Sequence, residues 1–207
     1  MWLDANDQDS LVLRGDTVVQ WKDKSGLNNN ATSVNNPTIQ KGAILLNGQG
    51  QHFTTNYSAH LPAETSFIVY SVANQNQVSL IESGAARGRQ FMNNGGGGVG
   101  PSLANNAIVW LATGKLPTAL NTQYLGECVY NQSGMSLYLN GKLSLSNSTN
   151  PNFTDGLTTI GGSPSQRDYY LAGTISEVII YNSVLSTEDR QNVESYLASK
   201  WNLSMSN

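Results

Sequence analysis

Apolar and polar residues alternate in short runs along most of the chain, and clusters of Gly, Asn, Pro and Ser separate these runs. Alternation with a period of two places one face of a strand in a core, whereas a short continuous apolar run is typical of a strand buried on both faces. Strands and helices do not alternate regularly in this pattern. The sequence therefore predicts an all-β fold, with strands at 18–21, 43–46, 66–73, 78–82, 108–112 and 124–130.

A β-hairpin within 135–145 is the clearest local prediction. Met135, Leu137 and Leu139 occupy every second position and so share one face of a strand. The Asn140-Gly141 pair that follows supplies two residues that tolerate the positive φ angles of a type I′ turn. We expect a hairpin with one buried face.

The C-terminal segment predicts a buried strand followed by a helix. Residues 173–182 are β-branched and mostly apolar, which favours a position inside a sheet. Ser186 then predicts a helix N-cap, with Asp189 three positions later. The apolar stripe of this helix consists of Val193, Leu197 and Trp201, with Tyr196 beside it. We expect one C-terminal α-helix that packs against the strands.

Length and composition narrow the class of protein. A chain of 207 residues fits one sandwich domain spanning residues 1–207 and can bury a sizeable core. Only 12% of the residues are charged and the net charge is −3, with Lys and Arg scattered singly. This pattern predicts neither nucleic acid nor anionic lipid as a partner. The chain as given shows no signal peptide and no apolar run long enough for membrane insertion. Cys128, the single cysteine, is expected in the core.

Three parts of the chain carry a resemblance to a known family. They are Trp2-Leu3-Asp4-Ala5 with 19–26 and 30–32, the hairpin 137–141, and 173–182 with Leu185-Ser186, Tyr196-Leu197 and Lys200-Trp201. In this order they resemble the bacterial and viral branch of the laminin G-like domains, in the concanavalin A-like lectin and glucanase superfamily. The resemblance implies a jelly-roll sandwich of two antiparallel sheets on an exported or surface-displayed protein. It implies no particular activity, because the same sandwich serves lectins, adhesion modules, glycosidases and spacers.

Catalytic constellations are missing from the sequence. A glycosidase needs two carboxylates at a short fixed separation, but Glu82, Glu127 and Glu177 are each alone on their strands. We expect Glu177 to be a sheet-end or partnered structural residue. The two histidines, His52 and His60, lack the spacing of zinc ligands, and no nucleophile elbow occurs. The sequence therefore predicts a protein that is not an enzyme.

Calcium is the cofactor that the resemblance implies, with Asp carboxylates on the rim as ligands. Asp4 and Asp7 lie close together near the start of the chain, and Asp23 follows a predicted strand. These three are the candidate metal ligands. Asp is also a common turn residue, so Asp23 has the competing interpretation of capping a turn with its own backbone.

Sugar binding needs aromatic faces and polar groups on loops. The segment Arg167-Asp168-Tyr169-Tyr170 is the preferred ligand-binding candidate. Trp110, Tyr57 and Arg89, which precedes the glycine run 95–98, are further candidates. For each aromatic residue the alternative is packing in the core, and that alternative is stronger for Trp2, Trp21, Trp201 and Tyr181.

The sequence thus predicts a non-catalytic recognition or adhesion module that binds a glycan or surface polymer outside the cell, on a cell surface or on a virion. The alternative is a structural or interaction domain, such as a virion decoration or a spacer, whose partner is a protein in a larger assembly. A sugar binder should have a concave site with aromatic side chains, whereas a packing domain should have a self-complementary apolar patch.

Overall fold

The structure is a computed structural model. It describes residues 1–59, 63–83, 89–93, 101–104, 110–113, 118–148, 156–163 and 169–206. At 59, 89, 90, 101–104 and 110–113 it describes the strand positions and not the side chains.

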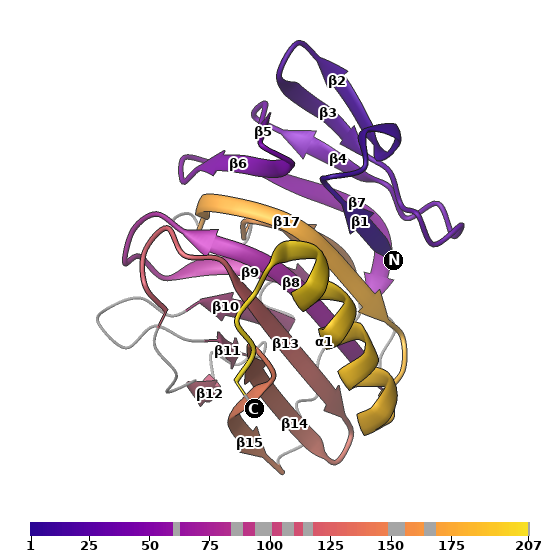
Figure 1. Ribbon diagram of the computed structural model, residues 1–207, viewed down its shortest axis with the longest axis vertical. Coiled ribbons are helices and arrows are strands. Elements are labelled where there is room, and N and C mark those ends of the chain that lie inside the picture. Colours follow the sequence, from indigo (N-terminus) through magenta and orange to yellow (C-terminus); the bar gives the residue numbers. More distant parts are fainter. Residues whose placement is uncertain are drawn as a thin grey trace.

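Two layers of antiparallel strands lie face to face, which confirms the predicted all-β sandwich (Figure 1). The first layer, in pairing order, is β1 (Trp2–Asp4), β17 (Ala172–Tyr181), β8 (Glu64–Val72), β13 (Tyr124–Asn131), β14 (Gly134–Leu139) and β15 (Lys142–Asn147). The second is β2 (Leu11–Arg14), β3 (Thr17–Trp21), β4 (Ala31–Val34), β7 (His52–Ala59), β16 (Gly156–Ile160), β9 (Val78–Ser83), β10 (Arg89–Asn93), β11 (Pro101–Ala104) and β12 (Trp110–Thr113). The strands β5 (Thr38–Gln40) and β6 (Ala43–Asn47) connect the layers, because β5 pairs with β3 and β6 pairs with β17.

The core lies between the two layers. Ile68 and Tyr70 of β8 point into it, as does Cys128 of β13, which is buried as expected. From the second layer, Trp21 and Phe53 pack edge to face with their ring centroids 5.7 Å apart. Large aromatic and branched side chains of this kind contribute most of the apolar area that folding removes from water.

The first layer is buried on its outer face too, which explains why β8 and β17 read as continuous apolar runs. A short 3-10 helix, Gln8–Ser10, follows β1, and the single α-helix of the described chain, α1 (Thr187–Trp201), lies across the outer face (Figure 1). Phe67 and Val69, which alternate with the core residues of β8, contact the α1 side chain Leu197. Alternate residues of β8, Phe67 and Val69, therefore pack against the apolar stripe of α1.

Local signals place the helix and the hairpin as predicted. The Ser186 side chain accepts a hydrogen bond from the backbone N–H of Asp189, so the N-cap is confirmed. Asn140 and Gly141 have φ angles of 49° and 77° in the turn that joins β14 to β15. The C-terminal helix and the hairpin are therefore confirmed.

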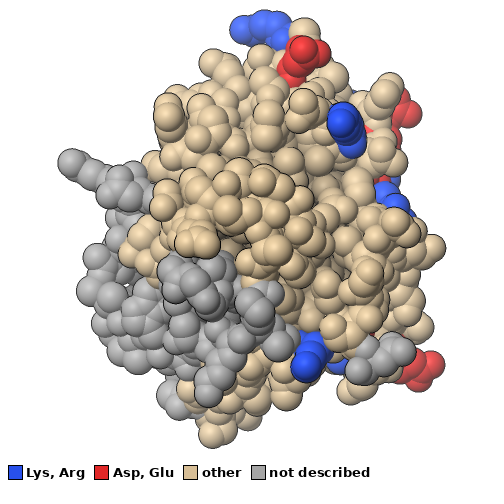
Figure 2. All heavy atoms as spheres, turned by 60° about the vertical axis from the view of Figure 1, so that its left-hand side comes forward, with Lys and Arg blue, Asp and Glu red and all other residues tan. Residues whose placement is uncertain are grey.

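One face of the molecule shows few charged side chains among its described residues. In Figure 2, the coloured Lys, Arg, Asp and Glu side chains lie mostly toward the edges of this face. The described part of the chain contains no helix with the length and apolarity of a membrane span.

Candidate functional site

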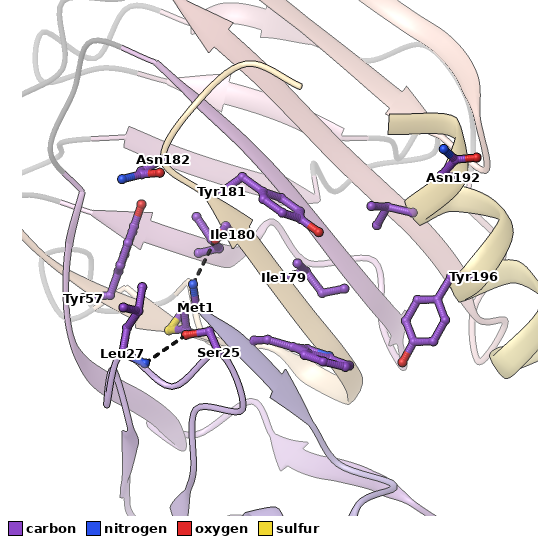
Figure 3. Close-up of a pocket in the computed structure, with 12 residues that line it drawn as sticks. Met1, Ser25, Leu27, Tyr57, Ile179, Ile180, Tyr181, Asn182, Asn192 and Tyr196 are labelled. Carbon is purple, nitrogen blue, oxygen red and sulfur yellow. Dashed lines mark hydrogen bonds between the residues drawn. The ribbon is translucent and has the colours of Figure 1, made fainter. Parts of the chain in front are cut away.

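A pocket of about 570 Å³ lies beside α1, at the end of β17 (Figure 3). Its walls come from β1, the turn after β3, β7, β17 and α1. Four aromatic side chains, Trp2, Tyr57, Tyr181 and Tyr196, line it. In Figure 3, Tyr57 lies on one side and Tyr196 on the other, with Tyr181 between them. The described structure therefore has a concave site that bears aromatic side chains.

Strand alternation forms the floor of this pocket. Ile179 and Tyr181 are two residues apart on the outer face of β17, and Trp2 of β1 lies opposite Ile179 in the register. Val193 and Tyr196, three positions apart on α1, form the adjoining wall. The outer face of β17 thus packs against α1, and at the end of the strand the Tyr181 side chain on this face lines the pocket.

A buried carboxylate fixes the orientation of the aromatic rings. Glu177 is 1% exposed, and its oxygens accept hydrogen bonds from Trp2 Nε1 at 2.7 Å and Tyr196 Oη at 3.0 Å. Trp201 Nε1 donates to the second oxygen at 2.6 Å. The Trp2 and Tyr196 rings pack edge to face with centroids 6.2 Å apart. Glu177 is thus a partnered structural residue, as predicted, and it holds two walls of the pocket.

Two lysines neutralise the acidic groups behind these rings. Lys200 Nζ lies 2.7 Å from both Asp4 Oδ2 and Glu177 Oε2. Lys24 Nζ lies 2.9 Å from Asp4 Oδ2 and 2.7 Å from Asp7 Oδ2. Burial disfavours the charged form of Asp4, but the hydrogen bonds from Lys200 and Lys24 outweigh it and hold the pKa of the carboxyl below its ordinary value. The pKa of Lys200 is raised, because its bonds to Asp4 and Glu177 outweigh the effect of burial.

The turn after β3 forms the rim of the pocket and is organised by Asp23. Burial opposes ionisation of Asp23, but hydrogen bonds from the backbone N–H groups of Trp2, Ser25 and Asn29 hold its pKa below the ordinary value. The turn places Leu27, which is 71% exposed, at the edge of the pocket. The interpretation of Asp23 as a residue that caps a turn with its own backbone is confirmed.

The lowered pKa values of Asp4 and Asp23 lead us to expect that the protein loses stability in acid. A group whose folded pKa is depressed contributes stability that is fully present above its unfolded pKa, about 3.9 for Asp, and is lost as pH falls through the folded pKa. We therefore expect the urea midpoint of unfolding to decline below about pH 4, and the decline to be shallower in Asp4→Asn than in the wild-type protein. Urea titrations of both proteins between pH 6 and pH 3 measure this difference. Equal slopes would mean that Asp4 carries none of the effect.

The calcium ligands predicted from the sequence do not fit a calcium site in this arrangement. Asp4 and Asp7 face Lys24, and Asp23 faces three backbone donors, so ammonium and N–H groups occupy the positions that a cation would need. Within the described ranges, no group of three or more His, Cys, Asp or Glu side chains could hold a metal ion. A calcium requirement stays a prediction.

The preferred sugar-binding segment falls partly outside the described residues. Arg167 and Asp168 lie in 164–168, which the structure does not describe. Tyr169 and Tyr170 are half-buried, and the Tyr170 ring packs on His52 with centroids 5.6 Å apart. The backbone carbonyl of Tyr169 accepts a hydrogen bond from the Ser79 N–H. For Tyr170 this packing matches the alternative interpretation, and a ligand role for the segment stays a prediction.

Of the remaining sugar-binding candidates, the structure describes the side chain of one and not those of the other two. Arg89 begins β10 and Trp110 begins β12, and their side chains are outside the description. Tyr57 does line the pocket. Trp2 and Tyr181, for which packing was the stronger interpretation, line it as well. The fold thus brings Tyr57 together with residues that the sequence assigned to packing.

Tertiary packing brings a strand carboxylate next to a carboxylate of the helix. Glu127 of β13 and Glu194 of α1 both pair with Arg190, whose guanidinium carbon lies 3.9 Å from the centroid of the Tyr138 ring. Burial, together with the neighbouring Glu194, raises the pKa of Glu127 well above its ordinary value, although Arg190 opposes this. Glu127 is alone on β13, as predicted, and its carboxylate neighbour comes from the helix. Both carboxylates are buried, and neither lines the pocket beside α1.

Comparison with known proteins identifies the fold. The sequence profile of the concanavalin A-like lectin/glucanases superfamily matches residues 58–189. No curated protein sequence matches the chain. Among solved structures, the binding domain of botulinum neurotoxin serotype D is 16% identical with a TM-score of 0.70, over 95% of this chain and 51% of that one.

Two further structures carry a sugar. The serotype D ligand binding domain in complex with N-acetylneuraminic acid is 18% identical with a TM-score of 0.63, over 91% of this chain and 51% of that one. The Trypanosoma rangeli sialidase in complex with sialic acid is 15% identical with a TM-score of 0.66, over 96% of this chain and 32% of that one. The chain therefore spans about half of each toxin domain and a third of the sialidase. At these identities the likeness shows the fold alone, which binding domains and an enzyme share.

Proposed function

The chain belongs to the concanavalin A-like lectin/glucanases superfamily, and we propose that it is a non-catalytic recognition module that binds a glycan in the pocket beside α1. The observation that carries this proposal is the pocket itself, whose walls are Trp2, Tyr57, Tyr181 and Tyr196. Its volume of about 570 Å³ lies in the range of small-ligand sites, about 300–1,000 Å³.

The chemistry of the lining suits a sugar ring. A pyranose presents C–H groups on its faces, which pack on aromatic rings, and hydroxyls around its edge, which need hydrogen-bond partners. Asn182 and Asn192 line the pocket and are exposed, so their amides offer both donors and acceptors at its mouth. Figure 3 places them on opposite sides, Asn182 near Tyr57 and Asn192 on α1.

Four described carboxylates in ion pairs support a binding role over hydrolysis. A glycosidase needs one carboxylic acid and one carboxylate facing a bound sugar. Glu127 and Glu194 are engaged by Arg190, and Asp4 and Glu177 by Lys200. Each of these four carboxylates is bound by a cation, and none of them lines the pocket.

We place the module on an exported or surface-displayed protein, where glycans and surface polymers are its available partners. A glycan-array screen of the purified domain, run with and without calcium, tests the proposed function. The variant Leu27→Asp puts a charge at the pocket rim, and we expect it to weaken binding at least about tenfold, or about 1.4 kcal/mol. Leu157→Asp is the matched control, because Leu157 is 62% exposed and lies on β16, outside the pocket lining.

The outcomes of the screen separate the two functional classes. Binding that Leu27→Asp weakens and Leu157→Asp leaves unchanged supports a lectin-type site in the pocket. Equal binding by both variants would move the site elsewhere. If no glycan is bound with or without calcium, the structural or interaction domain becomes the better account.

A further inference from the structure

The pocket carries no charged side chain. The side chains of all twelve lining residues are uncharged, and all twelve lie in the described part of the chain. Apolar and aromatic groups predominate, with Asn182, Asn192 and Ser25 as the polar exceptions. A carboxylate transferred into such a site loses its hydration without gaining a charged partner, which costs far more than burying a hydroxyl that can form hydrogen bonds.

Two lysines that lie beside the lining rings are already paired. Lys24 Nζ lies 4.6 Å from the centroid of the Trp2 ring, and Lys200 Nζ lies 5.4 Å from that of Tyr196. Lys24 is engaged by Asp4 and Asp7, and Lys200 by Asp4 and Glu177. The two lysines therefore share three carboxylates. Both ammonium groups are already neutralised and do not offer a charged partner to an acidic ligand.

The nitrogen of Met1 is engaged as well. It donates a hydrogen bond to the carbonyl oxygen of Ile180 at 2.9 Å. Burial lowers the pKa of this amino group, although the nearby Asp23 carboxylate opposes the shift. The Met1 nitrogen is therefore bound to the backbone of β17, with its hydrogen bond directed at Ile180.

From these observations we propose that the pocket selects uncharged sugars and discriminates against sialylated, sulfated and uronic acid glycans. This inference rests on the proposed glycan-binding function. The apolar face of a neutral pyranose packs on the aromatic walls, and its edge hydroxyls reach the amides of Asn182 and Asn192. An acidic sugar in the same position would leave its charge against Leu27 or an aromatic ring.

Matched ligand pairs test the selectivity. Lactose and 3′-sialyllactose, and each neutral array hit with its acidic counterpart, are titrated into the domain by calorimetry in 50 and 500 mM NaCl. We expect the neutral member of each pair to bind at least tenfold more tightly, with an affinity that changes less than about twofold between the two salts. Tighter binding of the acidic member, weakened by salt, would overturn the inference while leaving the glycan-binding function intact.

A charge introduced at the rim gives the reciprocal test. Leu27→Lys should raise the ratio of acidic to neutral affinity at least tenfold, whereas Leu157→Lys should leave it unchanged. An unchanged ratio in Leu27→Lys would contradict selection by the pocket's lack of charge. Absence of binding for every neutral and acidic sugar would overturn the glycan-binding function itself.

Discussion

Replacing Arg190 with methionine is expected to lower the free energy of unfolding by about 3–5 kcal/mol, the cost of removing one partner from a buried ion pair. Arg190 is 9% exposed, and it pairs with both Glu127 and Glu194. Methionine preserves much of the side-chain volume but leaves two buried carboxylates facing each other without a cation. The variant should lose its α1 contacts first, because Arg190 and Glu194 belong to that helix.

Urea denaturation at pH 7 measures this loss, with Arg14→Met as the control. Arg14 is exposed on β2, so its replacement should change the free energy of unfolding by less than about 0.5 kcal/mol. The single variant Glu127→Gln should cost less than Arg190→Met, because Arg190 keeps Glu194 as its charged partner and the glutamine amide still offers an acceptor oxygen. A cost for Arg190→Met as small as that for Arg14→Met would contradict the proposed role of the cluster.

Replacing Glu177 with alanine is expected to cost a similar amount, about 3–5 kcal/mol, and to weaken glycan binding as well. The substitution removes the acceptor for Trp2 Nε1, Trp201 Nε1 and Tyr196 Oη, and one of the two carboxylates that hold Lys200. These donors are partly buried, so each one left unsatisfied adds less than the cost of about 1–3 kcal/mol for a fully buried group. Because Trp2 and Tyr196 line the pocket, freeing their rings should disturb the binding surface.

Urea denaturation and glycan calorimetry on Glu177→Ala measure the two effects separately. Glu177→Gln keeps the shape and one acceptor oxygen, so we expect an intermediate stability and an affinity closer to wild type. Glu188→Ala, at an exposed position in the first turn of α1, is the control. Full affinity in a folded Glu177→Ala protein would show that the rings keep their places without this carboxylate.

The fold was predictable where local pattern and tertiary burial agree. Alternation placed Leu137 and Leu139 on the buried face of the hairpin, and the cap at Ser186 fixed the start of α1. β-branched composition identified β17 as an interior strand. These signals reflect neighbours within a few residues, which the sequence contains directly.

The candidate site was only partly predictable, because it depends on contacts between distant segments. Glu177 is separated from Trp2 by 175 positions, and no local pattern pairs them. Glu127 is the one carboxylate on β13, and its partner Arg190 comes from α1, 63 positions later in the chain. The signal that was available is the outer-face alternation of Glu177, Ile179 and Tyr181, which places a carboxylate and an aromatic ring on one surface. An aromatic residue assigned to packing can therefore also line a binding site.

The most direct test of the central claim is the response of the tryptophan indole N–H signals in the ¹H–¹⁵N NMR spectrum during titration with a glycan that the array identifies. Trp2 lines the pocket, whereas Trp21 is fully buried between the two strand layers. We predict a saturable shift of the Trp2 signal and an unchanged Trp21 signal. A glycan that binds while the Trp2 signal stays in place would contradict the assignment of the pocket beside α1 as the sugar site.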